Sequence, residues 1–376
     1  MDPAWKAFTG LFEDEAQLAV ERALAELRAG RPILLQGAQS RAMLVAIDAL
    51  SESAFAAIAG YPEIELELAL SRARARAIGL AVDGAVSLPV GGLNHEAVWR
   101  LAAGADAEPP ARWSPAGAMA LMGMELCKQA LLLPAVLIAE VGGPVHAPIH
   151  RLSLAEAQAS LGQSRVNLEI VSRARIPLAG DIEASFIVFR GAPALRDQLA
   201  IIVGDPDPQG PVALRLHSAC LTGDLFGSLR CDCGDQLRKA VQRLAEAGGG
   251  VLLYLDQEGR GTGLRNKLRA YALQDAGLDT IDADAMLGYG ADERRYEVAA
   301  GMLLRLGYRQ VRLLTNNPDK IAALRRAGIE VREVQPLAGV VTMENHRYLA
   351  TKARRAGHTL EDFLEPPRRA EGGRGR

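Results

Sequence analysis

The hydrophobic positions in the first part of the chain recur mostly at helical spacing. In residues 14–29 they lie three and four apart and stop at Gly30, which predicts an amphipathic helix closed by a glycine. Residues 32–36 are expected to form a strand, and residues 37–80, rich in Ala, Leu and Ile, to be largely helical. Paired Gly and Pro residues between positions 82 and 115 predict loops. This part of the chain contains few residue types that perform chemistry.

The second part of the chain shows a more regular alternation. A helix over residues 117–132 and a buried strand over residues 134–141 come first, and a domain boundary is predicted at residues 189–191. The strands expected beyond it are residues 212–218, 250–256 and 310–315, and the helices are residues 233–248, 264–277, 297–308 and one that starts at Asn317. We therefore expect an α+β chain of two α/β-type domains, residues 1–190 and 191–364, with a disordered Pro/Gly-rich tail, residues 365–376.

Length and charge place the chain among ordinary globular proteins. A chain of 376 residues can form two domains, each with its own core. Its formal net charge of -2 gives no argument for a nucleic-acid or membrane partner. The acidic start predicts no signal peptide, and Pro134 and Glu140 interrupt the most apolar segment. Four cysteines do not form a disulfide framework, so we expect a soluble protein of the reducing cytoplasm.

Three of the four cysteines, Cys220, Cys231 and Cys233, lie within residues 215–236. Zinc favours thiolate ligands, and three protein ligands leave a fourth position open for water, which is the pattern of catalytic zinc. His217 could supply a fourth ligand, which would give a closed structural site instead. Ordinary buried cysteines are the third interpretation. The spacing favours the catalytic zinc site.

Two loops between a strand and a helix are suited to anions. They are residues 256–263 (DQEGRGTG) and residues 315–320 (TNNPDK). Backbone N–H groups and the helix dipole attract an anion at such a turn, and Arg260 could bind a phosphate through two hydrogen bonds. Lys320 lies in a first helical turn, where a cation is unfavourable unless an anion is bound. A single turn of this kind is more often structural, but two near one zinc site predict a phosphorylated substrate.

Six segments follow one another in a characteristic order, namely RLHSACLTGDLFGSLRCDCG, QEGRGTGL, NK, RAYALQD, DERRY and LLTNNPDK. Over residues 198–345 this order closely resembles the GTP cyclohydrolase II family, which catalyses the first committed step of riboflavin synthesis. The resemblance implies opening of the GTP imidazole ring at C8 with release of formate and diphosphate. The product would be 2,5-diamino-6-(5-phosphoribosylamino)pyrimidin-4(3H)-one. The resemblance also implies a zinc ion that activates water, magnesium with the nucleotide, and a homodimer.

The resemblance further implies roles for individual residues. Cys220, Cys231 and Cys233 would be the zinc ligands. Asp292 matches the proton acceptor, Arg294 the residue assigned as nucleophile on the α-phosphate, and Tyr271 a tyrosine implicated in ring opening. The GTP-binding positions would be Arg215, Leu216, His217, Ser218, Ala219, Gln236, Glu258, Gly259, Arg260, Thr280, Thr315 and Lys320. Because arginine stays protonated, with a pKa above about 12, a phosphate clamp is the alternative role of the matched arginine.

Three positions depart from the family pattern. Ala219 replaces a glutamate, Asp256 an arginine and Asp284 an asparagine. Asp256 reverses the local charge beside the EGR loop. Ala219 and Asp256 favour a diverged enzyme that acts on another nucleotide or stops at the formamide intermediate. A non-catalytic regulator that binds zinc and a nucleotide is the remaining alternative. The retained catalytic positions argue against that regulator.

The N-terminal half has a weaker resemblance. Residues 117–141 loosely resemble the late helix and strand of 3,4-dihydroxy-2-butanone 4-phosphate synthase, which is often fused ahead of GTP cyclohydrolase II. The glycine-histidine-threonine-glutamate signature of that family is absent, and residues 36–44 replace its acidic magnesium-binding loop. Without these groups the synthase reaction has no acid, base or metal. We therefore expect a degenerate, non-catalytic domain that packs on the C-terminal domain or supports oligomerisation.

Overall fold

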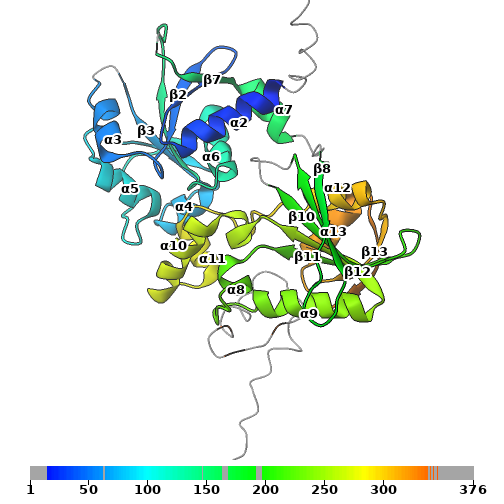
Figure 1. Cartoon of the computed structure of the whole chain (residues 1–376). Coiled ribbons are helices and arrows are strands. Elements are labelled where there is room, and N and C mark those ends of the chain that lie inside the picture. Colours follow the sequence, from blue (N-terminus) through cyan, green and yellow to red (C-terminus); the bar gives the residue numbers. More distant parts are fainter. Residues whose placement is uncertain are drawn as a thin grey trace, which may run out of the picture. The chain divides into compact units, whose positions relative to one another are not determined.

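The computed structural model describes residues 15–61, 64–145, 147–162, 168–191, 197–337, 339, 342 and 345. The chain packs into two compact units (Figure 1). Unit 1 comprises Met1–Glu169, Arg190–Asp197 and Gln257–Arg295, and unit 2 comprises Ile170–Phe189, Gln198–Asp256 and Tyr296–Arg376. Packing therefore groups residues 257–295 with the N-terminal part, whereas a single domain boundary near residue 190 stays a prediction. The expected tail, residues 365–376, lies outside the described residues.

Unit 1 contains a seven-stranded sheet in the order β5-β4-β3-β6-β2-β1-β7. Its strands are β1 (Ile33–Gln36), β2 (Arg41–Ala46), β3 (Glu67–Leu70), β4 (Val86–Pro89), β5 (Ser114–Pro115), β6 (Ala135–Glu140) and β7 (His150–Ser153). All neighbouring pairs are antiparallel except β1 with β7. The strands predicted at residues 32–36 and 134–141 are confirmed as β1 and β6.

Alternating side chains give this sheet two apolar faces. On β2, Leu44 packs into one core while Val45 packs into the other, as the period of two requires. The first core is covered by α2 (Glu15–Arg28), α6 (Ala118–Gln129) and α7 (Leu154–Gly162). The second core is covered by α3 (Glu52–Ala59), α4 (Arg72–Ala77) and α5 (His95–Ala103). The helices expected at residues 14–29 and 117–132 are thus confirmed.

Two expectations for unit 1 are wrong. Residues 37–80 are not largely helical, because they contain strands β2 and β3 as well as α3 and α4. The alternation of apolar and acidic residues in IELELAL, residues 64–70, has the period of a strand, and Ser71 then caps α4 by accepting a hydrogen bond from Arg74 N. Residues 82–115 are not only loops, since they form β4, α5 and β5.

Unit 2 contains a second seven-stranded sheet, in the order β14-β13-β11-β12-β10-β9-β8. Its strands are β8 (Glu169–Arg175), β9 (Ala184–Arg190), β10 (Gln198–Gly204), β11 (Val212–Ser218), β12 (Gly249–Leu255), β13 (Gln310–Leu314) and β14 (Glu330–Gln335). Its helices are α8 (Leu221–Asp224), α9 (Cys233–Glu246), α12 (Glu297–Leu306) and α13 (Pro318–Arg326). The strands and helices predicted for this region from residue 212 onward are confirmed.

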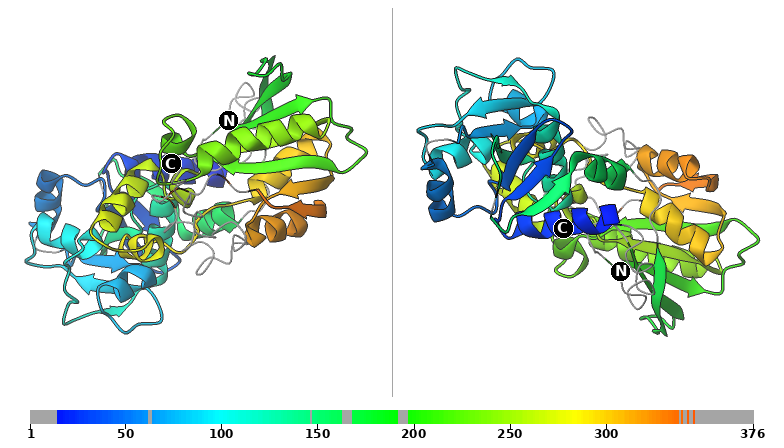
Figure 2. Two further views of the ribbon diagram at one scale, coloured as in Figure 1. Left: turned by 90° about the horizontal axis from the view of Figure 1, so that it is seen from below. Right: turned by 90° about the horizontal axis from the view of Figure 1, so that it is seen from above.

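The chain order in unit 2 creates a switch point in the sheet. From the interior strand β11, the chain crosses over α9 to β12 on one side of β11 and later crosses over α12 to β13 on its other side. Right-handed crossovers in opposite directions place their helices on opposite faces, and Figure 2 shows α9 on one face and α12 with α13 on the other. Ligands of such sheets bind outside the carboxyl ends of the two strands that flank the switch point, here β11 and β13.

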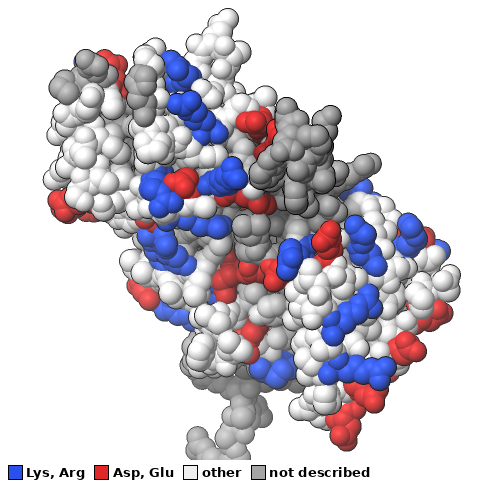
Figure 3. All heavy atoms as spheres, turned by 45° about the horizontal axis from the view of Figure 1, so that its top comes forward, with Lys and Arg blue, Asp and Glu red and all other residues white. Residues whose placement is uncertain are grey.

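Charged side chains of both signs are interspersed on the face shown in Figure 3, among the described residues of each unit. This distribution agrees with the formal net charge of -2 for the whole chain. No helix in the described part of the chain is both long enough and apolar enough to cross a membrane.

Candidate active site

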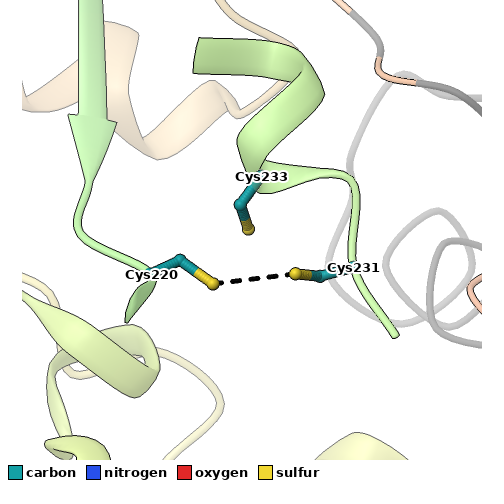
Figure 4. Close-up of side chains that lie close together, drawn as sticks. All are labelled: Cys220, Cys231 and Cys233. Atoms are coloured by element: carbon teal, nitrogen blue, oxygen red, sulfur yellow. Dashed lines mark hydrogen bonds between the residues drawn. The ribbon is translucent and has the colours of Figure 1, made fainter. Parts of the chain in front are cut away.

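Three thiols meet in unit 2 at the carboxyl end of β11. Cys220 follows β11, Cys231 lies in the loop that precedes α9, and Cys233 is the first residue of α9 (Figure 4). Their sulfur atoms all lie within 4.8 Å of one another, and the Cys220 and Cys231 sulfurs are 3.6 Å apart. Tetrahedral zinc with bonds of about 2.3 Å separates its sulfur ligands by about 3.8 Å. The cluster therefore has the dimensions of a zinc site.

The backbone around the cluster leaves room for the thiols. A Cβ atom added at Gly223 would lie 2.9 Å from the Cys231 sulfur and 3.0 Å from the Cys220 sulfur. Hydrogen bonding to Cys220 and Cys231, together with burial, raises the pKa of Cys233 well above its ordinary value. Three crowded thiols resist ionisation without a cation, and a bound metal reverses that effect. This donor set fits zinc.

His217 is held by a different group of residues. Its Nε2 lies 3.1 Å from both carboxylate oxygens of Asp224, and its ring stacks on Tyr254 at a centroid distance of 5.4 Å. Tyr254 and the backbone N–H of Cys220 also donate hydrogen bonds to Asp224. Burial, and then the charge of Arg215, lower the pKa of His217, so the imidazole is neutral near pH 7. In the described residues only the three cysteines form a metal-capable group, so His217 does not complete a four-ligand site.

The other residues predicted in unit 2 gather around the same strand ends. Arg215 on β11 donates to the carbonyl of Leu314 at the end of β13 and to Gln236 Oε1 on α9, at 3.0 and 2.5 Å. Lys320 of α13 is buried, and its Nζ donates to the carbonyl of Leu216 at 2.7 Å. Of the remaining predicted positions, Ser218 is the last residue of β11, Ala219 follows it, and Thr315 follows β13.

Among the buried polar atoms of this group, His217 Nδ1 and Ser218 Oγ have no hydrogen-bond partner in the described part of the chain. Buried polar groups are normally satisfied, because leaving one unpaired costs about 1–3 kcal/mol. Their position beside the switch point marks this end of the sheet as a place where a ligand can complete the hydrogen bonding.

The glycine-rich loop belongs to unit 1 and has a constrained backbone. Gly259 and Arg260 both have a φ of 63°, in the left-handed region that is unusual for arginine. Glu258 pairs with Lys267 at 2.8 Å, and Arg260 pairs with Asp284 at 3.2 Å while also donating to the carbonyl of Ala291. Strained backbone of this kind is concentrated at functional sites.

Asp292 and Arg294 form a two-pronged ion pair in unit 1. Arg294 Nε lies 2.8 Å from Asp292 Oδ1, and Arg294 NH2 lies 2.5 Å from Asp292 Oδ2. Burial raises the pKa of Asp292, but the hydrogen bonds and charge of Arg294 outweigh burial and leave that pKa below its ordinary value. Asp292 is therefore ionised and only weakly basic while the pair persists.

The remaining predicted residues of unit 1 lie on α10 (Leu264–Asp275) and α11 (Thr280–Met286). Tyr271 is half-buried on α10 with Lys267 Nζ 5.7 Å from the centre of its ring. Thr280 is the first residue of α11, which Asp279 caps. Asp224 and Lys267 were not among the residues predicted from the sequence. Their spacing could have identified them. Asp224 follows Cys220 by four positions, and Lys267 precedes Tyr271 by four on one helix, where such residues are neighbours.

The chain is similar in sequence to known proteins over most of its length. Residues 169–336 match the family model described as GTP cyclohydrolase II. A GTP cyclohydrolase-2 of Xylella fastidiosa (strain 9a5c) is 45% identical over 355 residues, which cover 93% of this chain and 89% of that protein. A GTP cyclohydrolase-2 of Azospirillum brasilense is 48% identical over 251 residues, covering 64% of this chain and 65% of the relative. The first of these matches spans both units.

A solved structure gives a weaker comparison. The two-domain 3,4-dihydroxy-2-butanone 4-phosphate synthase from A. baumannii aligns with 84% of this chain and 98% of its own, at 16% identity and a TM-score of 0.30. A likeness of that size supports no statement about the activity of unit 1. The Xylella fastidiosa relative, by contrast, shares 45% identity over nearly the whole chain. The chain therefore belongs to the GTP cyclohydrolase II family of enzymes.

Proposed function

We propose that this protein is a zinc-dependent GTP cyclohydrolase that opens the imidazole ring of GTP and releases formate and diphosphate. The product would be 2,5-diamino-6-(5-phosphoribosylamino)pyrimidin-4(3H)-one, and the reaction would be the first step of riboflavin synthesis. The observation that carries this proposal is the three-thiol cluster beside the switch point of unit 2, with sulfur atoms within 4.8 Å of one another.

Cys220, Cys231 and Cys233 would hold the zinc ion, one per chain. When bound, zinc would supply a Lewis acid and lower the pKa of water for attack on C8 of guanine. Three protein ligands leave a coordination position open, as this chemistry requires. Magnesium would accompany the triphosphate, since the metal-capable group in the described part of the chain consists of cysteines alone.

The strand ends of unit 2 would bind the nucleotide. Asp224 accepts a hydrogen bond from His217 Nε2, which leaves Nδ1 as an acceptor for an N–H group of guanine. The hydroxyl of Ser218 offers a second unpaired group at the same edge. Arg215, Gln236 and Lys320 would bind or orient the substrate from neighbouring elements, and the proposed GTP contacts also include Leu216, Ala219 and Thr315.

The proposal assigns the phosphate chemistry to unit 1. Arg294 is a hydrogen-bond donor to Asp292 and stays protonated, so its chemistry suits a clamp on the α-phosphate better than a nucleophile. If Arg294 turned to the phosphate, Asp292 would lose its partner and gain basicity. Asp292 could then accept a proton from the water that attacks the α-phosphorus as the bond to diphosphate breaks. Glu258, Gly259, Arg260 and Thr280 would contribute to GTP binding, and Tyr271 to ring opening.

A diverged reaction is the second candidate, and the pairing of Asp284 favours it. Asp284, where the family commonly has asparagine, lies 3.2 Å from Arg260 and can neutralise a cation assigned to the triphosphate. Asp256, which replaces an arginine, lies at the end of β12 with its backbone N–H bonded to Gln198. Such an enzyme would act on another nucleotide or stop at the formamide intermediate.

The test is a comparison of Cys231→Ser with Cys127→Ala, which removes the one thiol outside the cluster. We expect Cys231→Ser to lose bound zinc and to reduce formate release from GTP by at least about a hundredfold, because a Lewis acid supplies several kcal/mol. Cys127→Ala should keep both its bound zinc and its formate release. Metal analysis and formate assays are the measurements. Full activity without zinc, or a zinc-loaded wild type that releases no formate from GTP, would contradict the proposal.

A further inference from the structure

The segment comprising residues 257–295 is built into the core of unit 1. Ala283, Leu287 and Tyr289 lie in the same apolar cluster as side chains of strands β2, β3, β4 and β6. The Tyr289 hydroxyl is buried and donates to the carbonyl of Leu132 at 2.8 Å. The segment that carries three proposed catalytic residues therefore packs on the N-terminal sheet, far away in sequence.

A buried carboxylate fixes helix α10 to this sheet. The side chain of Asp48, just after β2, is 0% exposed and lies 2.7 Å from Arg269 and 3.5 Å from Arg265. Asp48 also accepts a hydrogen bond from the backbone N–H of Leu133 at 3.2 Å. The guanidinium of Arg269 lies 5.0 Å from the centre of the Trp99 ring. Asp48 thus joins the end of one strand to two successive turns of the helix.

A buried arginine fixes helix α11 in a similar way. Arg74 is 1% exposed and donates to the carbonyl of Met286 at the end of α11 and to that of Gly104 after α5, at 2.7 and 2.8 Å. The last carbonyls of a helix lack partners within the helix and attract a cation. Ser71 also donates to the carbonyl of Gly288 at 2.6 Å. The N-terminal part of unit 1 therefore holds α10 by its charged face and α11 by the carbonyl at its C-terminal end.

The two faces of α10 have different roles. Arg265 and Arg269 are four residues apart and share one face, which meets Asp48. Lys267 and Tyr271 are also four apart, but they are displaced by two positions, or about 200° around the helix. That opposite face carries the Lys267 pair with Glu258 and the proposed ring-opening tyrosine. Anchoring one face fixes the direction of the other.

We infer that Asp48 and Arg74 are positioning residues, through which the N-terminal part of unit 1 holds α10 and α11 in the arrangement that the reaction needs. The role of Tyr271, Asp292 and Arg294 in that reaction rests on the proposed function, whereas the anchoring does not. A third contact, between Lys128 and Glu293 at 3.3 Å, extends the anchoring to the residue beside Asp292. Through this anchoring, the N-terminal part is required for turnover.

The experiment uses Asp48→Asn and Asp48→Glu in the full chain, with Arg269→Gln as a second way to remove the ion pair. Val20→Ala is the control for general destabilisation, because it opens a small cavity in the other core, on the opposite face of the sheet. Asp83→Asn is the control for charge, since Asp83 pairs with Arg76 at an exposed site. Hydrogen exchange of α10 and α11, zinc content, and kcat and KM for GTP are measured well below the unfolding temperature.

We expect faster hydrogen exchange in α10 and α11, unchanged exchange in α9, full zinc content and a kcat reduced by about 10- to 100-fold in Asp48→Asn and Arg269→Gln. Asp48→Glu should recover part of the kcat, and both controls should resemble wild type in exchange and kcat. Exchange and kcat in Asp48→Asn that match those of Val20→Ala would overturn the inference. If wild type releases no formate, the proposed function fails, and the exchange data alone still decide whether Asp48 anchors the helix.

Discussion

Asp284 and Asp292 are two carboxylates of unit 1 with opposite shifts in pKa. Burial, with the negative charges of Asp292 and Glu293, raises the pKa of Asp284 to about 7 despite the opposing charge of Arg260. Arg294 holds the pKa of Asp292 below its ordinary value. Neighbouring acids with separated pKa values are suited to hold and to accept protons in the same reaction.

The protonation of Asp284 predicts how stability depends on pH. Its pKa is about 7 in the folded chain and about 3.9 when unfolded, so only the folded state keeps the proton between these values. The free energy of unfolding should then fall with rising pH across this window, by up to about 4 kcal/mol in total. Asp284→Asn removes this loss. Its stability advantage over wild type should grow from pH 5 to pH 7 in denaturant titrations and level off above, and an advantage independent of pH would refute the assignment.

At the scale of elements, the short turns after β11 and β13 position the proposed nucleotide contacts. Asn317 caps α13 by accepting a hydrogen bond from Asp319 N at 2.8 Å, and Pro318 occupies the first turn. This cap fixes the first turn of α13, from which Lys320 reaches the carbonyl of Leu216. The Asn317 cap therefore fixes the position of Lys320, one of the proposed GTP contacts.

Removing that cap should affect both stability and binding. We expect Asn317→Ala to destabilise the protein by about 1 kcal/mol and to raise the KM for GTP several-fold, because Lys320 loses its fixed position. Ser51→Ala is a matched control, since Ser51 caps α3 in the same way in unit 1. It should lower the unfolding midpoint by a similar amount and leave the KM unchanged. Equal KM values for GTP in the two variants would show that the Asn317 cap does not contribute to nucleotide binding.

The sequence predicted elements well where local pattern and tertiary burial agree. In unit 2, the apolar runs of β11 and β12 and the capped start of α13 were recognisable because strands and helices there alternate between clear turn residues. In residues 37–80 the high Ala and Leu content suggested helix, although the alternation in residues 64–70 was a local signal for β3. Strand β2 has no such signal and is selected by tertiary packing.

The candidate site was predictable to the extent that its residues are close in sequence. The spacing of Cys220, Cys231 and Cys233 predicted their cluster, which the structure brings together. The contact of Asp48 with Arg269 joins distant segments, and no local pattern in the sequence predicts which arginine a buried carboxylate will meet. The sequence alone did not decide whether His217 is a zinc ligand, because the answer depends on its contact with Asp224 in the folded chain.

At the scale of the whole molecule, both units lie within one stretch of sequence that matches a relative. The 45% identity with the Xylella fastidiosa relative covers 93% of this chain, so it includes the N-terminal sheet as well as the cysteine cluster. The proposed function divides its residues between the units, with zinc and base recognition in unit 2 and phosphate chemistry in unit 1. In the inferred arrangement, the N-terminal sheet contributes to the enzyme by anchoring α10 and α11.

The most direct test of the proposed function is to measure the formate and the diphosphate that the purified full chain releases from GTP with zinc and magnesium. We expect equal amounts of the two products, each matching the GTP consumed, and loss of both formate and ring-opened product when zinc is removed by chelation. Diphosphate without formate would contradict ring opening and favour the diverged reaction. Release of neither product by the zinc-loaded protein would contradict the proposed function as a whole.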